Sequence, residues 1–422
     1  MGKRVLYAGL TIVFGAFAGA FAWTFFFLMN SGIHLLWEVV PAQLAALGLP
    51  AVFYPVAFCV LGGVCIGLFA AKAGPYPQDM NTVMAHVKAT GRYEYDHLGA
   101  SFFGALLPLL FGGSIGPEAG LTGVIAGLCT WVGDRLRFVG AEMRQLAESG
   151  TAAVISAIFA TPLFGLAVPV LGAADDSEGT LPASKISLEV PKPMKVAVYV
   201  LAVAGALGMM ALLGHLFGAG GGLPRFTDIQ LGQVELLWAL PLILAGAVTG
   251  WLFFPFGVLA RKVSGLLGNH VVAKAVIAGC VLGLAGCALP FALFAGEAQT
   301  EELAECWTML GAGVLIATGF VKVFVTQWCL NLGWRGGHFF PLIFAGISLG
   351  YGLAALTGAD PVFALCAVTG ALVGAVMRQP LMTVVLLFLV FPVAGAPVLL
   401  MAAAVGALLP VPAEGHEGTE DS

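Results

Sequence analysis

Two similar stretches stand out in the chain: Gly112-Gly113-Ser114-Ile115-Gly116-Pro117-Glu118 and Gly336-Gly337-His338-Phe339-Phe340-Pro341. Both place two glycines, three variable residues and a proline in front of a long apolar run. Proline is pre-set for the first turn of a helix, and the positive dipole end of that helix points back at the glycines. Each stretch therefore predicts an anion site made of backbone N–H groups, and together they predict a path for a small anion.

The composition is that of a membrane protein. Of 422 residues, 59% are hydrophobic and 10% are charged, and the mean hydropathy is +0.98. A soluble domain of this size could not cover its surface with so few polar groups. The 58 glycines fit helices that pack closely or break inside a bilayer. We expect an all-α polytopic membrane protein.

Apolar segments predict where the helices lie. They fall at roughly 5–29, 51–73, 98–111, 116–133, 142–160, 162–174, 194–218, 232–260, 270–296, 306–329, 340–357, 360–377, 380–391 and 395–409. Several are too short to cross a bilayer upright, which indicates tilted, re-entrant or broken helices. Residues 297–305 are predicted to form a solvated loop, and residues 413–422 an acidic, disordered tail.

The polar residues argue against several classes of function. The eight cysteines are scattered singly, which favours small buried hydrophobes over disulfides or metal ligands. No basic patch with interleaved aromatics indicates nucleic acid, and no His-Glu-x-x-His motif indicates a zinc protease. Ser114 is followed by isoleucine and lacks a convincing partner histidine, so an intramembrane serine protease is disfavoured. We expect no enzyme, cofactor, metal or nucleic-acid partner.

A second motif recurs in the same order as the glycine loops. Residues 153–163 match residues 371–381 as A-x-x-[SG]-A-x-[FM]-x-x-P-L. Each copy follows its glycine loop at a similar distance along the chain. With a polar break at 174–193, the chain divides into a first membrane repeat, 1–190, and a second, 191–412. The pattern leaves open whether the repeats are parallel or inverted.

Five stretches resemble, in order, the motifs of the CLC family of chloride channels and proton–chloride antiporters. Gly113–Pro117 is similar to G-[K/R]-E-G-P and Gly337–Pro341 to G-x-F-x-P, while Phe159–Gly165 is similar to F-N-A-P-L-A-G and Arg378–Thr383 to R-A-P-L-T. Ala73–Gln78 stands where the family carries G-S-G-I-P-E. The resemblance implies two inverted-topology halves, broken helices meeting near the midplane, and a homodimer with one pore per subunit.

The resemblance also implies which residues bind the anion. They are Gly74, Pro75, Tyr76, Gly113, Ser114, Ile115, Gly116, Pro117, Gly337, His338, Phe339 and Phe340. The family's anion-facing serine aligns with Gly74, so a backbone N–H or the Tyr76 hydroxyl would have to substitute. Packing between two prolines is an equal interpretation of Tyr76. Ser114 could line the outer path or simply stabilise its loop.

The chain departs from the family at the gate. The family's gating glutamate, which occupies the anion path and carries protons, aligns with Ile115, and isoleucine does not titrate. The relay glutamate of the antiporters would fall near Leu171, where no acid occurs before Asp175. The final helix with the family's tyrosine is expected to be missing. These departures predict a passive channel for chloride or a similar small anion.

Two residues keep an alternative open. Glu118 could be a displaced gate, or an acid in a first helical turn that complements the helix dipole. His338 could be a hydrogen-bonded structural residue or a proton carrier. The alternatives are therefore a proton-coupled chloride antiporter that uses Glu118 or His338, and a channel for another anion such as fluoride.

The expected surroundings follow from the same resemblance. We expect a multi-pass protein in the lipid bilayer of a prokaryotic inner (plasma) membrane. Its partners would be the anion and a second copy of the chain. The segments implied to face the second copy are 162–172, 194–216, 380–391 and 395–409.

Overall fold

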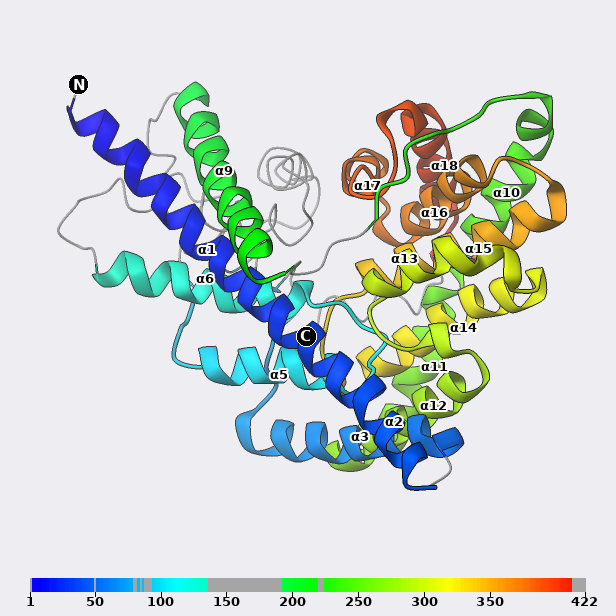
Figure 1. Ribbon diagram of the computed structural model, residues 1–422, viewed down its shortest axis with the longest axis horizontal. Coiled ribbons are helices and arrows are strands. Elements are labelled where there is room, and N and C mark those ends of the chain that lie inside the picture. Colours follow the sequence, from blue (N-terminus) through cyan, green and yellow to red (C-terminus); the bar gives the residue numbers. More distant parts are fainter. Residues whose placement is uncertain are drawn as a thin grey trace. The chain divides into compact units, whose positions relative to one another are not determined.

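All regular elements in the described part of the chain are helices. The computed structural model describes residues 2–48, 51–78, 82–83, 86, 93–135, 192–218 and 224–411. The α-helices (Figure 1) are α1 (Gly2–His34), α2 (Val40–Ala46), α3 (Tyr54–Ala73), α5 (Leu98–Leu110), α6 (Glu118–Arg135), α9 (Lys192–Phe217), α10 (Gln233–Trp251), α11 (Phe253–Leu266), α12 (Val271–Ala288), α13 (Glu297–Cys306), α14 (Ala312–Asn331), α15 (Phe339–Thr357), α16 (Pro361–Met377), α17 (Pro380–Leu387) and α18 (Ala396–Leu408). A π-helical turn, Leu35–Val39, joins α1 to α2, and short 3₁₀ turns lie at Ala51–Phe53, Pro290–Ala292, Trp307–Met309 and Val393–Gly395.

The helices confirm most of the apolar segments predicted from the sequence. One segment, 232–260, is divided in two, because α10 ends at Trp251 and α11 begins at Phe253. The prediction of a solvated loop at 297–305 is wrong. That stretch is α13, whose Thr300 and Leu303 are fully buried. Charge alone misled the prediction, since a ten-residue helix can bury one side and expose its acids on the other.

Within the described residues, seven helices are long and apolar enough to cross a membrane. Several shorter apolar helices accompany them, at 98–110, 118–128, 361–377 and 393–408. Long and short apolar helices together are the pattern expected when some helices break within the bilayer. The predicted class, an all-α polytopic membrane protein, is confirmed.

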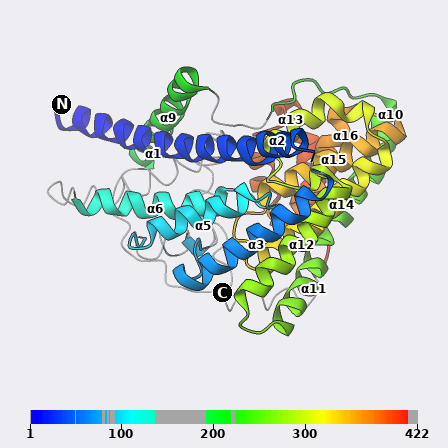
Figure 2. The same cartoon turned by 60° about the horizontal axis from the view of Figure 1, so that its bottom comes forward.

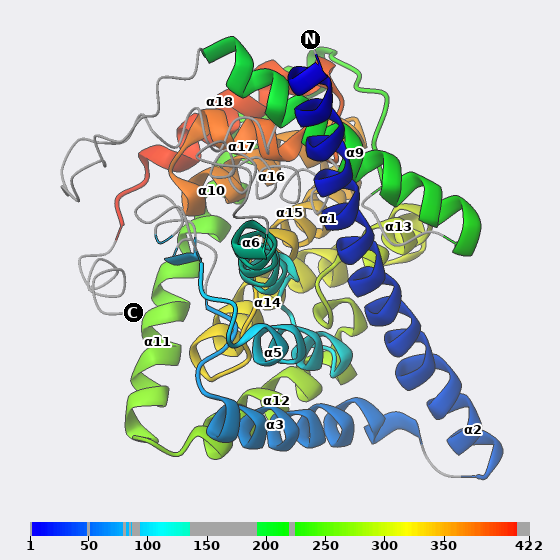
Figure 3. The ribbon, with the colours of Figure 1, turned by 90° about the vertical axis from the view of Figure 1, so that its left-hand side faces the viewer.

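The chain forms two compact units, each made of several segments. The first unit comprises Met1–Ser31, Pro75–Leu106 and Glu118–Gly222, and the second comprises Gly32–Gly74, Leu107–Pro117 and Leu223–Ser422. These units do not follow the predicted repeats, which remain a prediction about internal homology. In the first unit α1 lies beside α9 (Figure 3), and added Cβ atoms at Gly15 and Gly205 would collide with the facing backbone.

In the second unit, glycines likewise let helices approach closely. The pairs α3–α12, α10–α16, α14–α15 and α16–α18 pack against one another. Figure 2 shows α3 alongside α12, where a Cβ on Gly279 or Gly63 would collide with the partner's backbone. Helices α15 and α16 form the core, since nearly all of their side chains are buried. This buried core holds the second glycine loop at the start of α15.

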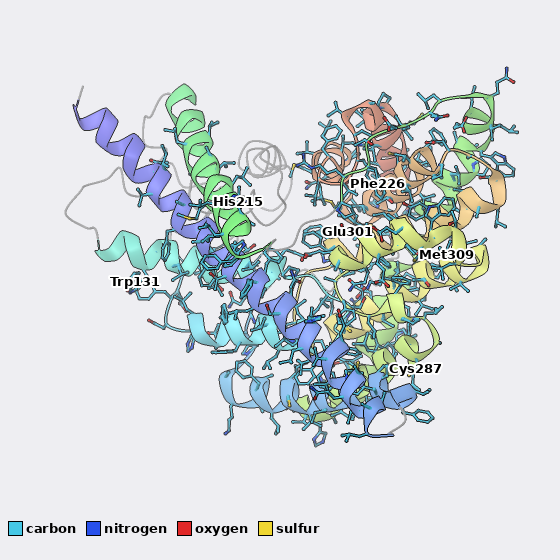
Figure 4. All side chains as sticks on the ribbon, viewed as in Figure 1. Trp131, His215, Phe226, Cys287, Glu301 and Met309 are labelled. Atoms are coloured by element: carbon cyan, nitrogen blue, oxygen red, sulfur yellow. The ribbon has the colours of Figure 1, made fainter. Side chains whose placement is uncertain are left out.

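Several predictions lie outside the described residues. They concern the repeat boundary at 190, the motif copy at 153–163, the interface segment 162–172 and the tail at 413–422. The seven cysteines whose side chains are described are free. Cys287 is exposed near the end of α12, and Phe226, on the segment before α10, stacks against Phe391 at 5.7 Å between ring centroids (Figure 4).

Candidate functional site

The two glycine loops meet in the second unit. Gly116 and Gly337 form an isolated antiparallel bridge, in which each amide donates a hydrogen bond of 2.8 Å to the carbonyl of the other. Both residues are buried. The two N–H groups are therefore used to join the loops, and any anion held here must be bound by other donors of the same stretches.

The first loop turns sharply at Gly112, which has φ +83°. This left-handed conformation favours glycine because a Cβ would clash with the backbone. The Gly113 amide donates to the Pro108 carbonyl at 2.8 Å, and the Phe294 amide donates to the Gly112 carbonyl at 2.9 Å. The loop is thus tied to the end of α5 on one side and to the segment following α12 on the other.

Ser114 is held by α14. Its side chain is fully buried, and its Oγ lies 3.0 Å from Thr326 Oγ1. Thr326 Oγ1 donates its proton to the Lys322 carbonyl at 2.7 Å, so Ser114 is the donor of the bond between the two hydroxyls. In this arrangement the Ser114 hydroxyl fixes the loop to α14.

Ile115 lies between the loops. It is fully buried, and a Cβ added at Gly336 would fall 2.6 Å from Ile115 Cδ1 and 2.8 Å from Ile115 Cβ. The side chain therefore occupies the space that only a glycine at position 336 leaves open. An apolar, tightly packed group stands where the sequence resemblance places a titratable gate.

Glu118 begins α6 in the first unit and is fully buried. Its backbone carbonyl accepts a hydrogen bond from Thr122 Oγ1 at 2.7 Å, one turn further along the helix. An acid at this place complements the positive end of the helix dipole. Complete burial of a carboxyl group in an apolar helix is unusual, and it makes Glu118 a group of interest for proton movement.

His338 and Phe339 form an aromatic cluster at the start of α15. The His338 ring lies 4.6 Å from the Phe339 ring and 5.5 Å from the Phe253 ring of α11, measured between centroids. His338 is partly exposed, whereas Phe339 and Phe340 are buried. The predicted residues of the second loop thus present their backbone at a helix start whose dipole favours an anion.

The third predicted loop follows α3. Gly74 ends the helix with φ +88°, and its amide donates to the Ala70 carbonyl at 3.0 Å. The Tyr76 ring stacks on His97 at 4.7 Å between centroids. This contact supports the packing interpretation of Tyr76. Participation of Gly74, Pro75 and Tyr76 in a common anion site remains a prediction.

Sequence reasoning missed Lys322. This lysine lies in the middle of the apolar helix α14 and is fully buried. An ionised lysine at the centre of a membrane helix costs about 3 kcal/mol on insertion scales, so its presence there indicates a specific use. The signal was a single lysine within the apolar segment 306–329.

Among the described residues, no group of three or more His, Cys, Asp or Glu side chains is placed to hold a metal ion. The polar groups that meet at the loops include backbone amides and the hydroxyls of Ser114 and Thr326. Such groups donate hydrogen bonds, and donors suit an anion rather than a cation. The fold and these loops define a class: helical membrane proteins that transport small anions.

Comparison of the sequence with models of protein families identifies the family of this chain. The model of the voltage-gated chloride channel family matches residues 56–410. The chain belongs to this family, as the ordered motifs predicted. The family's members are channels and transporters of anions, so the chain is an integral, multi-pass membrane protein of the CLC class.

Relatives and solved structures agree with this assignment. The chain is 27% identical, over 80% of its length and 78% of theirs, to the YfeO proteins of Salmonella paratyphi A and Salmonella typhimurium, each named as a candidate ion-transport protein. Its fold is similar to that of a slow cyanobacterial chloride/proton antiporter, with a TM-score of 0.73, 18% identity and coverage of 95% of this chain and 94% of the other. It is also similar to a CLC-type fluoride/proton antiporter, with a TM-score of 0.69, 18% identity and coverage of 97% and 96%. The predicted CLC-like fold is confirmed.

Proposed function

We propose that this protein is a passive channel for chloride or a similar small anion. The observation that carries the proposal is Ile115, which is fully buried and fills the space beside Gly336. The family motif places the gating acid at this position. A buried isoleucine neither takes up a proton nor imitates an anion, so the usual means of obligatory proton exchange is absent at this point.

The anion would be bound mainly by the protein backbone. The proposed ligands are the N–H groups of Ser114 and Ile115 in the first loop and of His338, Phe339 and Phe340 in the second. The Gly113 and Gly337 amides already donate to the Pro108 and Gly116 carbonyls, and Pro117 has no N–H, so these three residues shape the loops and the helix start. Glycine loops that lead into long apolar helices suit this use, because the dipole favours negative charge at the helix start. Gly74–Tyr76 would add ligands from a third loop.

The test replaces Ile115 in purified protein reconstituted in liposomes. Wild type is expected to release chloride at a rate that is constant between pH 5 and pH 7.5. Ile115→Glu is expected to make the rate pH-dependent, because a carboxylate in this position competes with the anion and is neutralised by acid. Ile115→Gln is the matched control, because glutamine has the size of glutamate but no charge. Its chloride release rate should not depend on pH. A wild type whose chloride flux pumps protons would contradict the proposal.

The second candidate is a proton-coupled antiporter. It is supported by the buried carboxyl group of Glu118 and by the likeness of the fold to chloride/proton and fluoride/proton antiporters. In that case Glu118→Gln should abolish proton movement while chloride still flows. His338→Gln tests the other proposed proton carrier in the same way. Repeating the flux assay with fluoride in place of chloride decides between the two anions.

We further propose a homodimer in a bacterial inner membrane. Salmonella relatives support this location, and the apolar surfaces of α17 and α18 support a partner there, since Leu381 and Met401 are largely exposed. Cross-linking of Met401→Cys in native membranes is expected to give a dimer band. A band at the mass of the single chain under all oxidising conditions would argue against this interface.

A further inference from the structure

The buried ammonium of Lys322 is surrounded by backbone carbonyls. Its Nζ donates to the carbonyls of Phe294 at 2.6 Å and Leu293 at 2.7 Å, with longer contacts to Ala292 at 3.2 Å and Phe291 at 3.4 Å. An ammonium has three protons and accepts no hydrogen bond, so these carbonyls satisfy it completely in its charged form. The Phe344 ring face, 5.0 Å from Nζ, adds a cation–π contact.

Within the described residues, the Lys322 ammonium is solvated by carbonyls and paired with no carboxylate. All four recorded hydrogen-bond partners are neutral carbonyls, and none is a carboxylate. Glu297, the buried acid that begins α13, lies further along the same segment and is not among them. Carbonyl dipoles stabilise a cation without cancelling its net charge. Protonated Lys322 therefore brings a positive charge into the interior of the second unit.

Two contacts connect this charge to the first glycine loop. The segment that holds the ammonium is itself bound to the loop, because the Phe294 amide donates to the Gly112 carbonyl. One turn after Lys322 on α14, Thr326 contacts the Ser114 hydroxyl. Four residues of α-helix rise by about 6 Å, which puts the ammonium on the order of 10 Å from the loop.

We propose that Lys322, in its protonated form, is the positive charge that attracts the anion to the Gly112–Pro117 loop and so raises the affinity of that loop for anions. The inference rests on the proposed function, since it concerns the same site, but it holds equally for a channel and for an antiporter. If Lys322 only filled space or donated hydrogen bonds to carbonyls, an uncharged side chain of similar size with N–H groups would serve equally well. At this distance and an effective dielectric constant of about 20, one unit charge changes the binding of a monovalent anion roughly tenfold.

The test measures chloride binding to the intact protein in detergent by calorimetry, alongside its thermal unfolding temperature. Lys322→Gln keeps N–H donors for the carbonyls but removes the charge, and it is expected to weaken chloride binding roughly tenfold. Lys322→Arg keeps the charge and should stay within about twofold of wild type. Lys262→Gln, which removes the charge of an exposed lysine on α11, is the matched control and should have no effect.

A second pair of variants leaves Lys322 in place. Phe344→Glu puts a carboxylate beside the ammonium and should weaken chloride binding as Lys322→Gln does, whereas Phe344→Gln should not. If Lys322→Gln fails to fold, this pair of variants still shows whether the Lys322 charge strengthens chloride binding. Unchanged chloride binding in folded Lys322→Gln or Phe344→Glu overturns the inference while the proposed function stands. If wild type binds neither chloride nor fluoride, both the inference about Lys322 and the proposed function are overturned.

Discussion

Replacement of Gly336 by alanine tests how the two glycine loops fit together. The new methyl group would lie 2.6 Å from Ile115 Cδ1, 2.8 Å from Ile115 Cβ and 2.9 Å from the Gly116 carbonyl oxygen. Carbon atoms in contact are normally 3.5–4.0 Å apart, so all three atoms must move. Extra methyl groups in a packed interior cost about 1–3 kcal/mol, and we expect Gly336→Ala to lose about that much unfolding free energy.

A second substitution identifies the atom responsible. Ile115→Val removes Cδ1, the nearest of the three atoms, and leaves Cβ and the Gly116 carbonyl in place. Alone, Ile115→Val should cost about 0.5–1.5 kcal/mol through the lost packing. Combined with Gly336→Ala it should cost less than the sum of the two single changes, with a coupling of about 0.5 kcal/mol or more.

The assay is reversible unfolding of purified protein in mixed micelles, followed by tryptophan fluorescence. Gly313→Ala is the control, because a Cβ added there, near the start of α14, meets no atom within 4 Å. It should leave the unfolding free energy unchanged or slightly higher. If Gly336→Ala is as stable as wild type, or if the double variant is strictly additive, Ile115 and Gly336 are not packed against each other in this way.

Two further substitutions test polar contacts in the second unit. Ser114→Ala removes the hydroxyl that donates to Thr326 and should lower the unfolding free energy by about 1 kcal/mol. Ser114→Thr keeps a hydroxyl and should retain most of the stabilisation from this hydrogen bond. Glu235→Gln should cost about 1 kcal/mol, because the Glu235 carboxylate accepts from the Gly232 and Asp360 amides at 2.8 and 2.9 Å through different oxygens and glutamine has one. The same fluorescence assay measures both, and a change below 0.3 kcal/mol would argue against either contact.

Local sequence patterns predicted the helices and the loops that precede them. Proline and glycine punctuate the chain, so the starts of α6 and α15 could be placed within a residue or two from Pro117 and Pro341. Composition and apolar length predicted the membrane class, and the order of the motifs predicted the family. Each of these features depends on neighbouring residues or on sums over the chain, so it can be read from a single sequence.

The contacts between distant segments could not be predicted in the same way. The bridge between Gly116 and Gly337 joins residues in different halves of the chain, and no local pattern specifies which amide pairs with which carbonyl. The partner of Ser114 likewise depends on how α14 is turned about its axis. Lys322 is a different case: a lysine in an apolar helix is visible in the sequence, but only the structure identifies the carbonyls that hold it.

In the proposed function, anions pass through this protein without obligatory proton exchange. It is tested most directly by the reversal potential of reconstituted protein under a fixed chloride gradient, with and without an opposing pH gradient. For a passive channel the reversal potential stays at the chloride equilibrium value and does not move when the pH gradient is imposed. A shift of the reversal potential with the pH gradient would show that protons are coupled to the anion and that the protein is an exchanger rather than a passive channel.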